Sequence, residues 1–423
     1  MPEFHRYLRI FFLTAASLLG LAASVVFFVD PFGVYQSPKI AGFNKIKPEI
    51  AKHESLAKAY LVRAYKPAGL VIGTSRSDFG LDPAHPGWAA SAQPVYNSSI
   101  SGGGIYEAMR YFQHALAASE IKQVILSLDM SMFSRSKSTP GGVKSVAPGF
   151  SEERLLSAAS GQRRAVSDLE LWKMLLSFDA LNAARNTLGH QNDLSAQIYL
   201  DNGLTYWRDA ATWLRTKESH HAQFGYMERM FANKVWWPDT EQRWKFDDPT
   251  DPQPSLELFR AIVKLAHAGN IDLRIIISPA HARMWEVLKA AGLWRQWGFW
   301  KRALLGVLMA EAKTANATPF PLWDFSGHNS ITTEDFPPLA SKRTMRWYWD
   351  GSHYTKEAGD LILDRIFGHN EPGRRVPDDF GVLLTPDNIE AHLAALGAQR
   401  EAYALRHPRA VNEAHNRRVK SSR

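Results

Sequence analysis

Short apolar runs alternate with amphipathic segments over most of the chain. Apolar residues at helical spacing predict helices at residues 56–65, 105–117, 256–268 and 299–316. Between them, continuous apolar runs predict buried strands at 69–73, 95–97, 124–129, 273–279 and 321–324. Strands that alternate with helices are typical of a parallel sheet with helices on both faces. The pattern therefore predicts an α/β domain of three layers around a central parallel sheet.

The start of the chain has a different pattern. Residues 10–29 contain no charged side chain, and a helix of this length can cross a hydrocarbon core of ~30 Å. A cleaved signal peptide is the alternative, but its apolar region is usually about 7–15 residues long. Because Val25-Val26-Phe27-Phe28-Val29 continues beyond the small residues at 22–24, we predict a retained transmembrane anchor.

The flanking charges bear on the orientation of this anchor. Arg6 and Arg9 precede it, whereas the residues directly after it, 30–37, carry no positive charge. Positive residues close to a span favour the cytoplasmic side. Lys39, Lys45 and Lys47 follow within twenty residues and leave the orientation open. The nearest flank favours a cytoplasmic N-terminus, with the main domain outside the cytoplasmic membrane of a bacterium.

A long interruption at residues 134–254 exceeds any ordinary connection between neighbouring strands and helices, so it must have structure of its own. We expect a mostly helical insertion. It is rich in aromatic residues: Tyr199, Tyr206, Trp207, Trp213, Phe224, Tyr226, Phe231, Trp236, Trp237 and Trp244. These form either a lid or subsite wall for a ligand, or the small core of a separate helical cap.

These patterns divide the chain into six segments. The first two are a cytoplasmic N-terminus at 1–9 and the anchor at 10–29. The α/β domain has two parts, 30–133 and 255–370, on either side of the insertion at 134–254. The last segment, 371–423, is a C-terminal extension whose basic tail after Arg400 is expected to be solvated and partly disordered, or to touch an anionic surface.

Composition narrows the chemistry. The 423 residues are 45% hydrophobic, enough for a large core, and the net charge is +8. There is no cysteine, which excludes disulfides, thiolate metal sites and a cysteine nucleophile. The neighbouring His220 and His221 would point about 100° apart on a helix, so they predict no metal site. The basic residues follow no nucleic-acid-binding motif, and we expect neither a cofactor nor a nucleic-acid partner.

Three residues carry the candidate chemistry. The strand at 69–73 leads directly to Ser75, while Asp350 and His353 lie together near the end of the domain. A helical turn would place residues i and i+3 on one side, so an acid and a base at this spacing can both face one nucleophile. His353 would accept the proton of Ser75, and Asp350 would orient the imidazole. The alternative is that Asp350 only caps a helix and that His353 is a surface histidine.

The order of these motifs resembles that of the SGNH/GDSL hydrolase superfamily. The resemblance rests on three short blocks: Gly73-Thr74-Ser75, Asn97-Ser98-Ser99-Ile100-Ser101-Gly102 and Asp350-Gly351-Ser352-His353. It implies a flavodoxin-like α/β fold, a catalytic triad of Ser75, His353 and Asp350, and an oxyanion hole built from the backbone N–H groups of Ser75 and Gly102. Arg76, Asn97, Ser101 and Asp129 are then expected to line the site.

Two positions depart from the family pattern. Thr74 replaces the usual aspartate, and the end of the third strand carries Asp129 where the family has an asparagine that donates to the oxyanion. An ionised Asp129 would repel an oxyanion. The Gly-Thr-Ser-Arg variant is similar to the membrane-anchored bacterial branch that acylates or deacylates envelope polymers.

The resemblance implies an acyl-ester hydrolase or an O-acyltransferase that acts on a cell-envelope saccharide. The two activities share the same triad and differ only in whether water or a sugar accepts the acyl group. The expected partners are the lipid bilayer, an envelope glycan and a membrane protein that donates the acyl group. The alternative is a catalytically weak binding or assembly factor with the same fold, which the missing asparagine favours and the intact triad opposes.

Overall fold

A single sheet with the strand order β2-β1-β3-β4-β5-β6 lies at the centre of the molecule. The computed structural model describes residues 2–134, 147, 149–158, 160–166, 168–205, 219–236, 244–247, 254–337 and 343–417. The strands are β1 (Gly69–Ile72), β2 (Val95–Asn97), β3 (Gln123–Leu128), β4 (Asp272–Ile277), β5 (Leu322–Asp324) and β6 (Val382–Leu384). The first five are parallel, and β6 pairs antiparallel with β5. The five predicted strands and the α/β class are confirmed.

Alternate residues of the strands face opposite sides of the sheet, where two hydrophobic cores form. Leu70 and Leu126 belong to a core shared with helices α4 (Ile105–Ala118), α10 (Ser255–Ala268) and α12 (Trp294–Ala315). Val71 and Ile125 belong to the core on the other face, which includes residues of α13 (Lys356–Phe367). The strands are thus apolar on both faces, as parallel strands between two helical layers must be.

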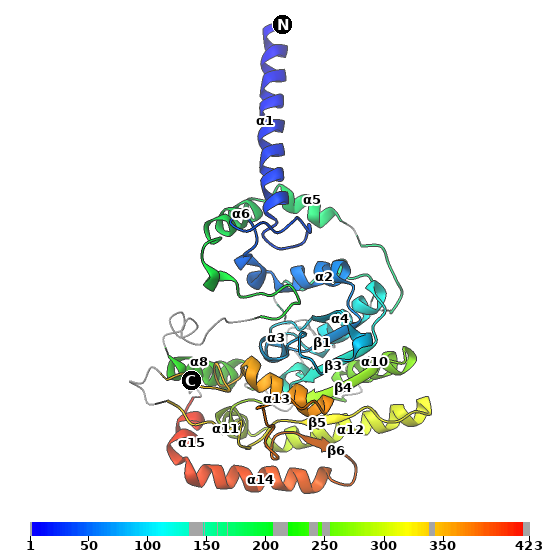
Figure 1. The fold of residues 1–423 in the computed structure, drawn as a ribbon, viewed down its shortest axis with the longest axis vertical. Coiled ribbons are helices and arrows are strands. Elements are labelled where there is room, and N and C mark those ends of the chain that lie inside the picture. Colours follow the sequence, from blue (N-terminus) through cyan, green and yellow to red (C-terminus); the bar gives the residue numbers. More distant parts are fainter. Residues whose placement is uncertain are drawn as a thin grey trace.

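The remaining α-helices of the described residues lie on these layers or at the two ends of the molecule (Figure 1). They are α1 (Pro2–Val29), α2 (Glu54–Tyr65), α3 (Ser75–Gly80), α5 (Leu169–Leu175), α6 (Phe178–Gly189), α8 (His220–Met230), α11 (Ala282–Ala290), α14 (Ile389–Arg406) and α15 (Pro408–His415). The four predicted helices are present, although α12 begins five residues earlier than its pattern suggested, at Trp294.

Helix α1 projects from one end of the molecule (Figure 1). Among the described residues, it contains the one segment, Glu3–Val29, that is long and apolar enough to cross a membrane. Most of its length is exposed, but Val26 and Val29 at its C-terminal end are buried against the domain.

The described part of the insertion is partly helical, but four of its aromatic residues belong to the main cores rather than to a core of their own. Phe231, Trp236 and Trp244 join the core between the sheet and α10, and Phe224 joins the core on the other face. The prediction of a self-contained helical cap was therefore wrong for these four residues, because they complete the main cores. Tyr206, Trp207, Trp213 and Trp237 lie outside the described residues.

The C-terminal extension also differs from its prediction. It supplies the edge strand β6 and then α14 and α15, which lie at the opposite end of the molecule from α1 (Figure 1). Arg400 donates to Glu286 and Arg417 to Glu228, and both glutamates are buried. As far as Arg417 the tail is folded, and Arg417 neutralises a buried carboxylate, whereas the side chain of Arg409 is 93% exposed, as a solvated tail would have it. Residues 418–423 lie outside the described part.

Candidate active site

Ser75 is the first residue of α3, immediately beyond the carboxyl end of β1. Thr74 is the N-cap, and its side chain accepts from the N–H of Arg76. Strand β1 lies between β2 and β3. The chain therefore moves toward one edge of the sheet from β1 to β2, and toward the other edge from β2 to β3, so the strand order reverses next to β1. Crevices at such a switch point are where ligands bind in parallel sheets. Ser75 is half-buried whereas the next three residues are buried, which leaves the serine accessible.

Asp350 and His353 lie in a tight loop between the bridged residues Tyr348 and Tyr354. The Asp350 Oδ1 accepts from the N–H groups of Ser352 and His353, at 2.8 and 2.9 Å. The expected helical turn is therefore wrong, because the aspartate side chain closes the turn instead. Asp350 does not cap α13 either, since the N-cap of that helix is Thr355.

The three predicted residues form one hydrogen-bonded chain. His353 Nε2 lies 2.7 Å from Ser75 Oγ, and His353 Nδ1 lies 2.8 Å from Asp350 Oδ2. Burial alone would raise the pKa of Asp350, but His353 and the two backbone N–H groups lower it below its usual value. An ionised Asp350 can only accept, so Nδ1 carries the proton and Nε2 is free to accept one from Ser75.

Helices α3 and α13 approach each other closely enough to bring these elements together. A Cβ atom on Gly359 of α13 would lie 1.8 Å from the backbone oxygen of Gly80, the last residue of α3. Only glycine permits this contact. The ring of Phe79 on α3 also stacks on the His353 imidazole, with centroids 4.7 Å apart. The helix crossing thus fixes Ser75 and His353 relative to each other.

A buried ion pair links α3 to the loop that carries Asp350 and His353. Arg76 donates through Nη1 to Asp129 Oδ1 and through Nε to Ser352 Oγ, the latter at 3.0 Å. The other oxygen of Asp129 accepts from Thr74 Oγ1 at 2.5 Å. Asp129 therefore lies in the site region as predicted, but both its oxygens are engaged by cationic or hydroxyl donors. Its charge is neutralised by Arg76 rather than directed at an oxyanion.

The other predicted lining residues have structural partners. Asn97 donates both amide hydrogens, to Ser77 O at 2.9 Å and Leu81 O at 3.0 Å, so it has none left for an oxyanion. The Ser101 N–H donates to Glu54. Gly102 follows in an exposed turn at φ +71°, a conformation that favours glycine. The N–H groups of Ser75 and Gly102 make no hydrogen bond to the described part of the chain and remain the predicted oxyanion donors.

A buried cluster of charged residues contacts the segment that leads to the turn at Gly102. Lys58 is fully buried and contacts Asp78 of α3, Glu54 of α2 and the carbonyl oxygen of Ser99. Burial raises the pKa of Asp78. The cluster connects α3 to the segment before Gly102. Sequence reasoning missed it, because Glu54 and Lys58 at a four-residue spacing look like an ordinary pair on a helix surface.

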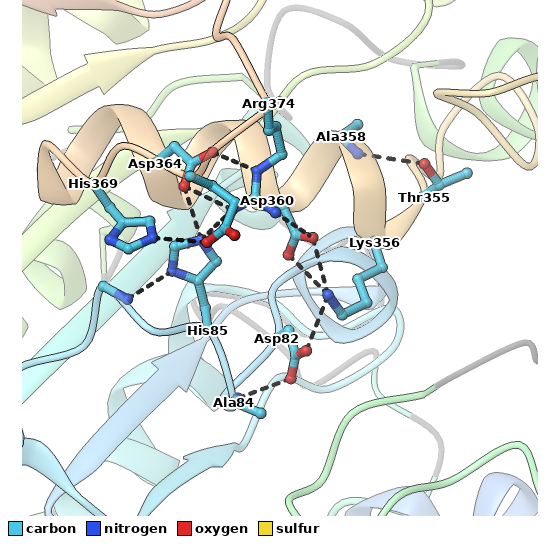
Figure 2. A network of polar contacts seen from close by, with 12 residues as sticks. Asp82, Ala84, His85, Thr355, Lys356, Ala358, Asp360, Asp364, His369 and Arg374 are labelled. Carbon is cyan, nitrogen blue, oxygen red and sulfur yellow. Dashed lines mark hydrogen bonds and ion pairs between the residues drawn. The ribbon is translucent and has the colours of Figure 1, made fainter.

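Polar contacts also hold α13 against the segment that follows α3 (Figure 2). Lys356 bridges Asp360 and Asp82, and Asp364 binds both His85 and Arg374. Since the loop of Asp350 and His353 leads directly into α13, these contacts help to keep that loop next to α3. Apart from the four-residue spacing of Lys356 and Asp360 on α13, the sequence pattern did not indicate these contacts, because the other partners come from separate elements.

No metal site was predicted at His220, and its side chain contacts the loop that carries Asp350 and His353. Its Nδ1 lies 3.1 Å from the carbonyl oxygen of Trp349, and its Nε2 accepts from the N–H of Met345, also at 3.1 Å. Among the described residues, no group of three or more His, Asp or Glu side chains is arranged to hold a metal ion.

No protein-family model matches the chain, and no curated protein is significantly similar to it. An accessible serine at a helix N-terminus, a histidine that can accept its proton and a buried carboxylate that orients the histidine can together perform nucleophilic catalysis.

Proposed function

We propose that the protein is a serine esterase or O-acyltransferase of the SGNH type that acts on acyl esters of a cell-envelope saccharide. The observation that carries the proposal is the chain of hydrogen bonds from Ser75 through His353 to Asp350. The order of the parallel strands, 2-1-3-4-5, supports it, because this is the order of flavodoxin-like sheets. In this proposal α1 is a single transmembrane anchor and the catalytic domain lies outside the cytoplasmic membrane.

The proposed reaction has two halves. Ser75 Oγ attacks the ester carbonyl while His353 Nε2 takes its proton, and the oxyanion is held by the N–H groups of Ser75 and Gly102. The C–O bond to the alcohol breaks, His353 protonates the departing alcohol, and an acyl-serine remains. Water or a sugar hydroxyl then gives its proton to His353 and attacks the acyl carbonyl. The bond between the acyl carbon and Ser75 Oγ then breaks, the free acid or the new sugar ester leaves, and His353 returns its proton to Ser75 Oγ.

The polar side chains around Ser75 affect whether water or a sugar accepts the acyl group. Asn97 has no free amide hydrogen and Asp129 is a paired carboxylate, so neither supplies a side-chain donor to the oxyanion. The loss of one such donor typically costs about 10²- to 10³-fold in kcat. Slow hydrolysis would suit a transferase, whose acyl-enzyme must survive until a sugar arrives.

The first test compares single and double variants. Ser75→Ala and His353→Ala should each abolish nearly all turnover of p-nitrophenyl acetate, and the double variant should be little worse, because the two residues act as one unit. Ser195→Ala is the matched control, since Ser195 is exposed and its hydroxyl donates only to Asp193. Full turnover in the folded Ser75→Ala protein would remove Ser75 as the nucleophile.

The second test separates catalysis from binding, and then transfer from hydrolysis. A folded wild-type protein that neither turns over the ester nor reacts with a fluorophosphonate would favour the binding or assembly factor instead. If an acyl-enzyme forms, a single-turnover experiment should follow its decay in water and with added oligosaccharide. Release only to the sugar would assign the transferase, and release only to water would assign the esterase.

A further inference from the structure

The C-terminal end of α1 is built into the domain. Carbonyl oxygens in the last turn of a helix lack partners within the helix. Here the carbonyls of Phe27, Phe28 and Val29 accept from Ser37 Oγ, Asn44 Nδ2 and Lys47 Nζ, which come from the segment after the helix. Because side chains of the domain cap the helix, α1 is a rigid extension of the domain rather than a flexible tether.

Helices α5 and α6 pack around this end of α1 (Figure 1). Val26 of α1 shares a hydrophobic cluster with Ala180 and Ala183 of α6, and Met174 of α5 packs against it. The hydroxyl of Tyr35 donates to the carbonyl of Leu171 and joins α5 to the same region. These two helices belong to the predicted insertion, yet they lie at the end of the molecule from which α1 projects.

The outward side of α5 and the start of α6 are apolar as well. Trp172 is 69% exposed, Leu176 58% and Phe178 75%. An isolated exposed apolar residue is ordinary, but a group of large ones marks an interaction surface. Helix α5 thus carries apolar side chains both toward the domain, as at Met174, and on its exposed side, as at Trp172. We call Trp172, Leu176 and Phe178 the collar.

We propose that the collar inserts into the lipid interface beside α1 and forms a second attachment to the membrane. The inference rests on the proposed role of α1 as a membrane anchor. The collar adjoins the end of that anchor, where aromatic residues are enriched in membrane proteins. Exposed Lys173 follows Trp172 on α5, and a lysine between aromatic and aliphatic side chains suits an interfacial helix. Nearby exposed Asp179 offsets its charge, so the attachment is mainly apolar.

A second attachment would restrict the domain more than α1 alone. A single helix lets the domain rotate about the helix axis, whereas the collar would hold one side of the domain against the bilayer. The candidate active site would then keep one orientation and one height above the membrane. A membrane-bound acyl donor or a growing glycan would meet Ser75 in a defined direction.

The absence of native cysteine permits a direct test in the full chain. Trp172→Cys, Leu176→Cys and Phe178→Cys proteins are labelled one at a time with an environment-sensitive fluorophore and reconstituted in phosphatidylcholine vesicles. We expect emission at shorter wavelength, strong quenching by headgroup-level nitroxide lipids and weak quenching by aqueous iodide. Leu405→Cys is the matched control, because Leu405 is 84% exposed on α14, at the opposite end of the molecule.

A label on Leu18→Cys, in the exposed middle of α1, reports on the anchor independently. Quenching of that label by nitroxide lipids, together with collar labels that behave like Leu405→Cys, would overturn the collar and leave the anchor intact. Collar labels shielded from both quenchers would also overturn it, and would show that another protein surface covers the collar. An aqueous Leu18→Cys label would refute the anchor itself and the collar with it.

Discussion

The guanidinium of Arg76 joins three parts of the candidate site. Arg76 follows Ser75 in α3. Its guanidinium pairs with Asp129, just after β3, and donates to Ser352 in the loop that carries Asp350 and His353. Ser352 donates its own N–H to Asp350. None of these contacts involves Ser75 Oγ, so we interpret Arg76 and Asp129 as positioning residues, which hold the nucleophile and the base in register.

Replacement of Asp129 by asparagine should therefore lower both stability and kcat. Removal of one partner from a buried ion pair typically costs about 3–5 kcal/mol, because the other charge stays buried without compensation. Asp129→Asn keeps part of the hydrogen bonding, so we expect the lower end of that range. Thermal melting in detergent and p-nitrophenyl acetate turnover would measure the two effects. The KM should change less than kcat, because the substrate contacts remain.

The double variant Arg76→Met with Asp129→Leu is the informative comparison. It removes both charges together, so it should regain most of the stability but little of the activity. Glu390→Gln, which breaks an exposed pair with Arg302, serves as the control and should change neither property appreciably. An Asp129→Asn protein that hydrolyses the ester faster than the wild type would contradict the positioning role and indicate a repelled oxyanion.

At the scale of elements, the crossing of α3 and α13 sets the distance between serine and histidine. The loop that carries His353 continues into α13 at Thr355, and α13 touches α3 backbone to backbone at Gly359 and Gly80. The contacts of Lys356 and Asp364 hold the same helix from its sides. The triad geometry thus depends on helix packing that lies outside the triad itself.

Gly359→Ala should push the two helices apart. The added methyl group would overlap the Gly80 carbonyl, and overpacking of this kind typically costs about 1–3 kcal/mol. Ester turnover should fall together with the melting temperature. Gly306→Ala on α12 is the matched control, because its Cβ would meet nothing within 4 Å; it should be stabilising by about 0.5–1 kcal/mol. Equal behaviour of the two variants would show that the close approach does not control the site.

At the scale of the whole molecule, acid should weaken the fold through its buried histidines. Both ring nitrogens of His114, on α4, contact the backbone. Its Nε2 lies 2.7 Å from the carbonyl oxygen of Ala59, and its Nδ1 accepts from the N–H of Leu156. Burial lowers the pKa of His114 to about 4, against 6.5 for an unperturbed histidine. The unfolded chain therefore binds this proton first as the pH falls. Stability from the neutral His114 is complete above pH 6.5 and is lost as the pH falls toward 4.

His114→Gln should isolate this effect. At pH 7.5 the variant should be less stable than the wild type, because hydrogen bonds of the buried imidazole are lost. At pH 5 the unfolded wild type gains a proton on His114 that the folded protein does not bind, which lowers its free energy of unfolding by about 2 kcal/mol. The variant has no such loss, so the difference in the free energy of unfolding between the two proteins should shrink by that amount. Denaturant unfolding at both pH values would measure the gap. A gap that stays constant would mean that His114 is not held neutral in the fold.

The sequence by itself determined the pattern of the sheet and the three residues of the candidate triad. Apolar strands such as 69–73 have a strong local signal, and an acid three residues before a histidine is visible in any printed sequence. The α/β class, the five parallel strands and helices α2, α4, α10 and α12 followed from periodicity. These features depend on neighbours in the chain, which is why they could be predicted.

Only the tertiary structure decided which distant residues meet. The pairing of Arg76 with Asp129, the burial of Lys58, the contact of Gly359 with Gly80 and the use of insertion aromatics in the main cores all join separate elements. A charge or an aromatic ring looks the same in the sequence whether it is solvated or buried. Its partner is fixed by the packing of layers, because burial of a polar group requires a partner that only the complete fold brings within reach.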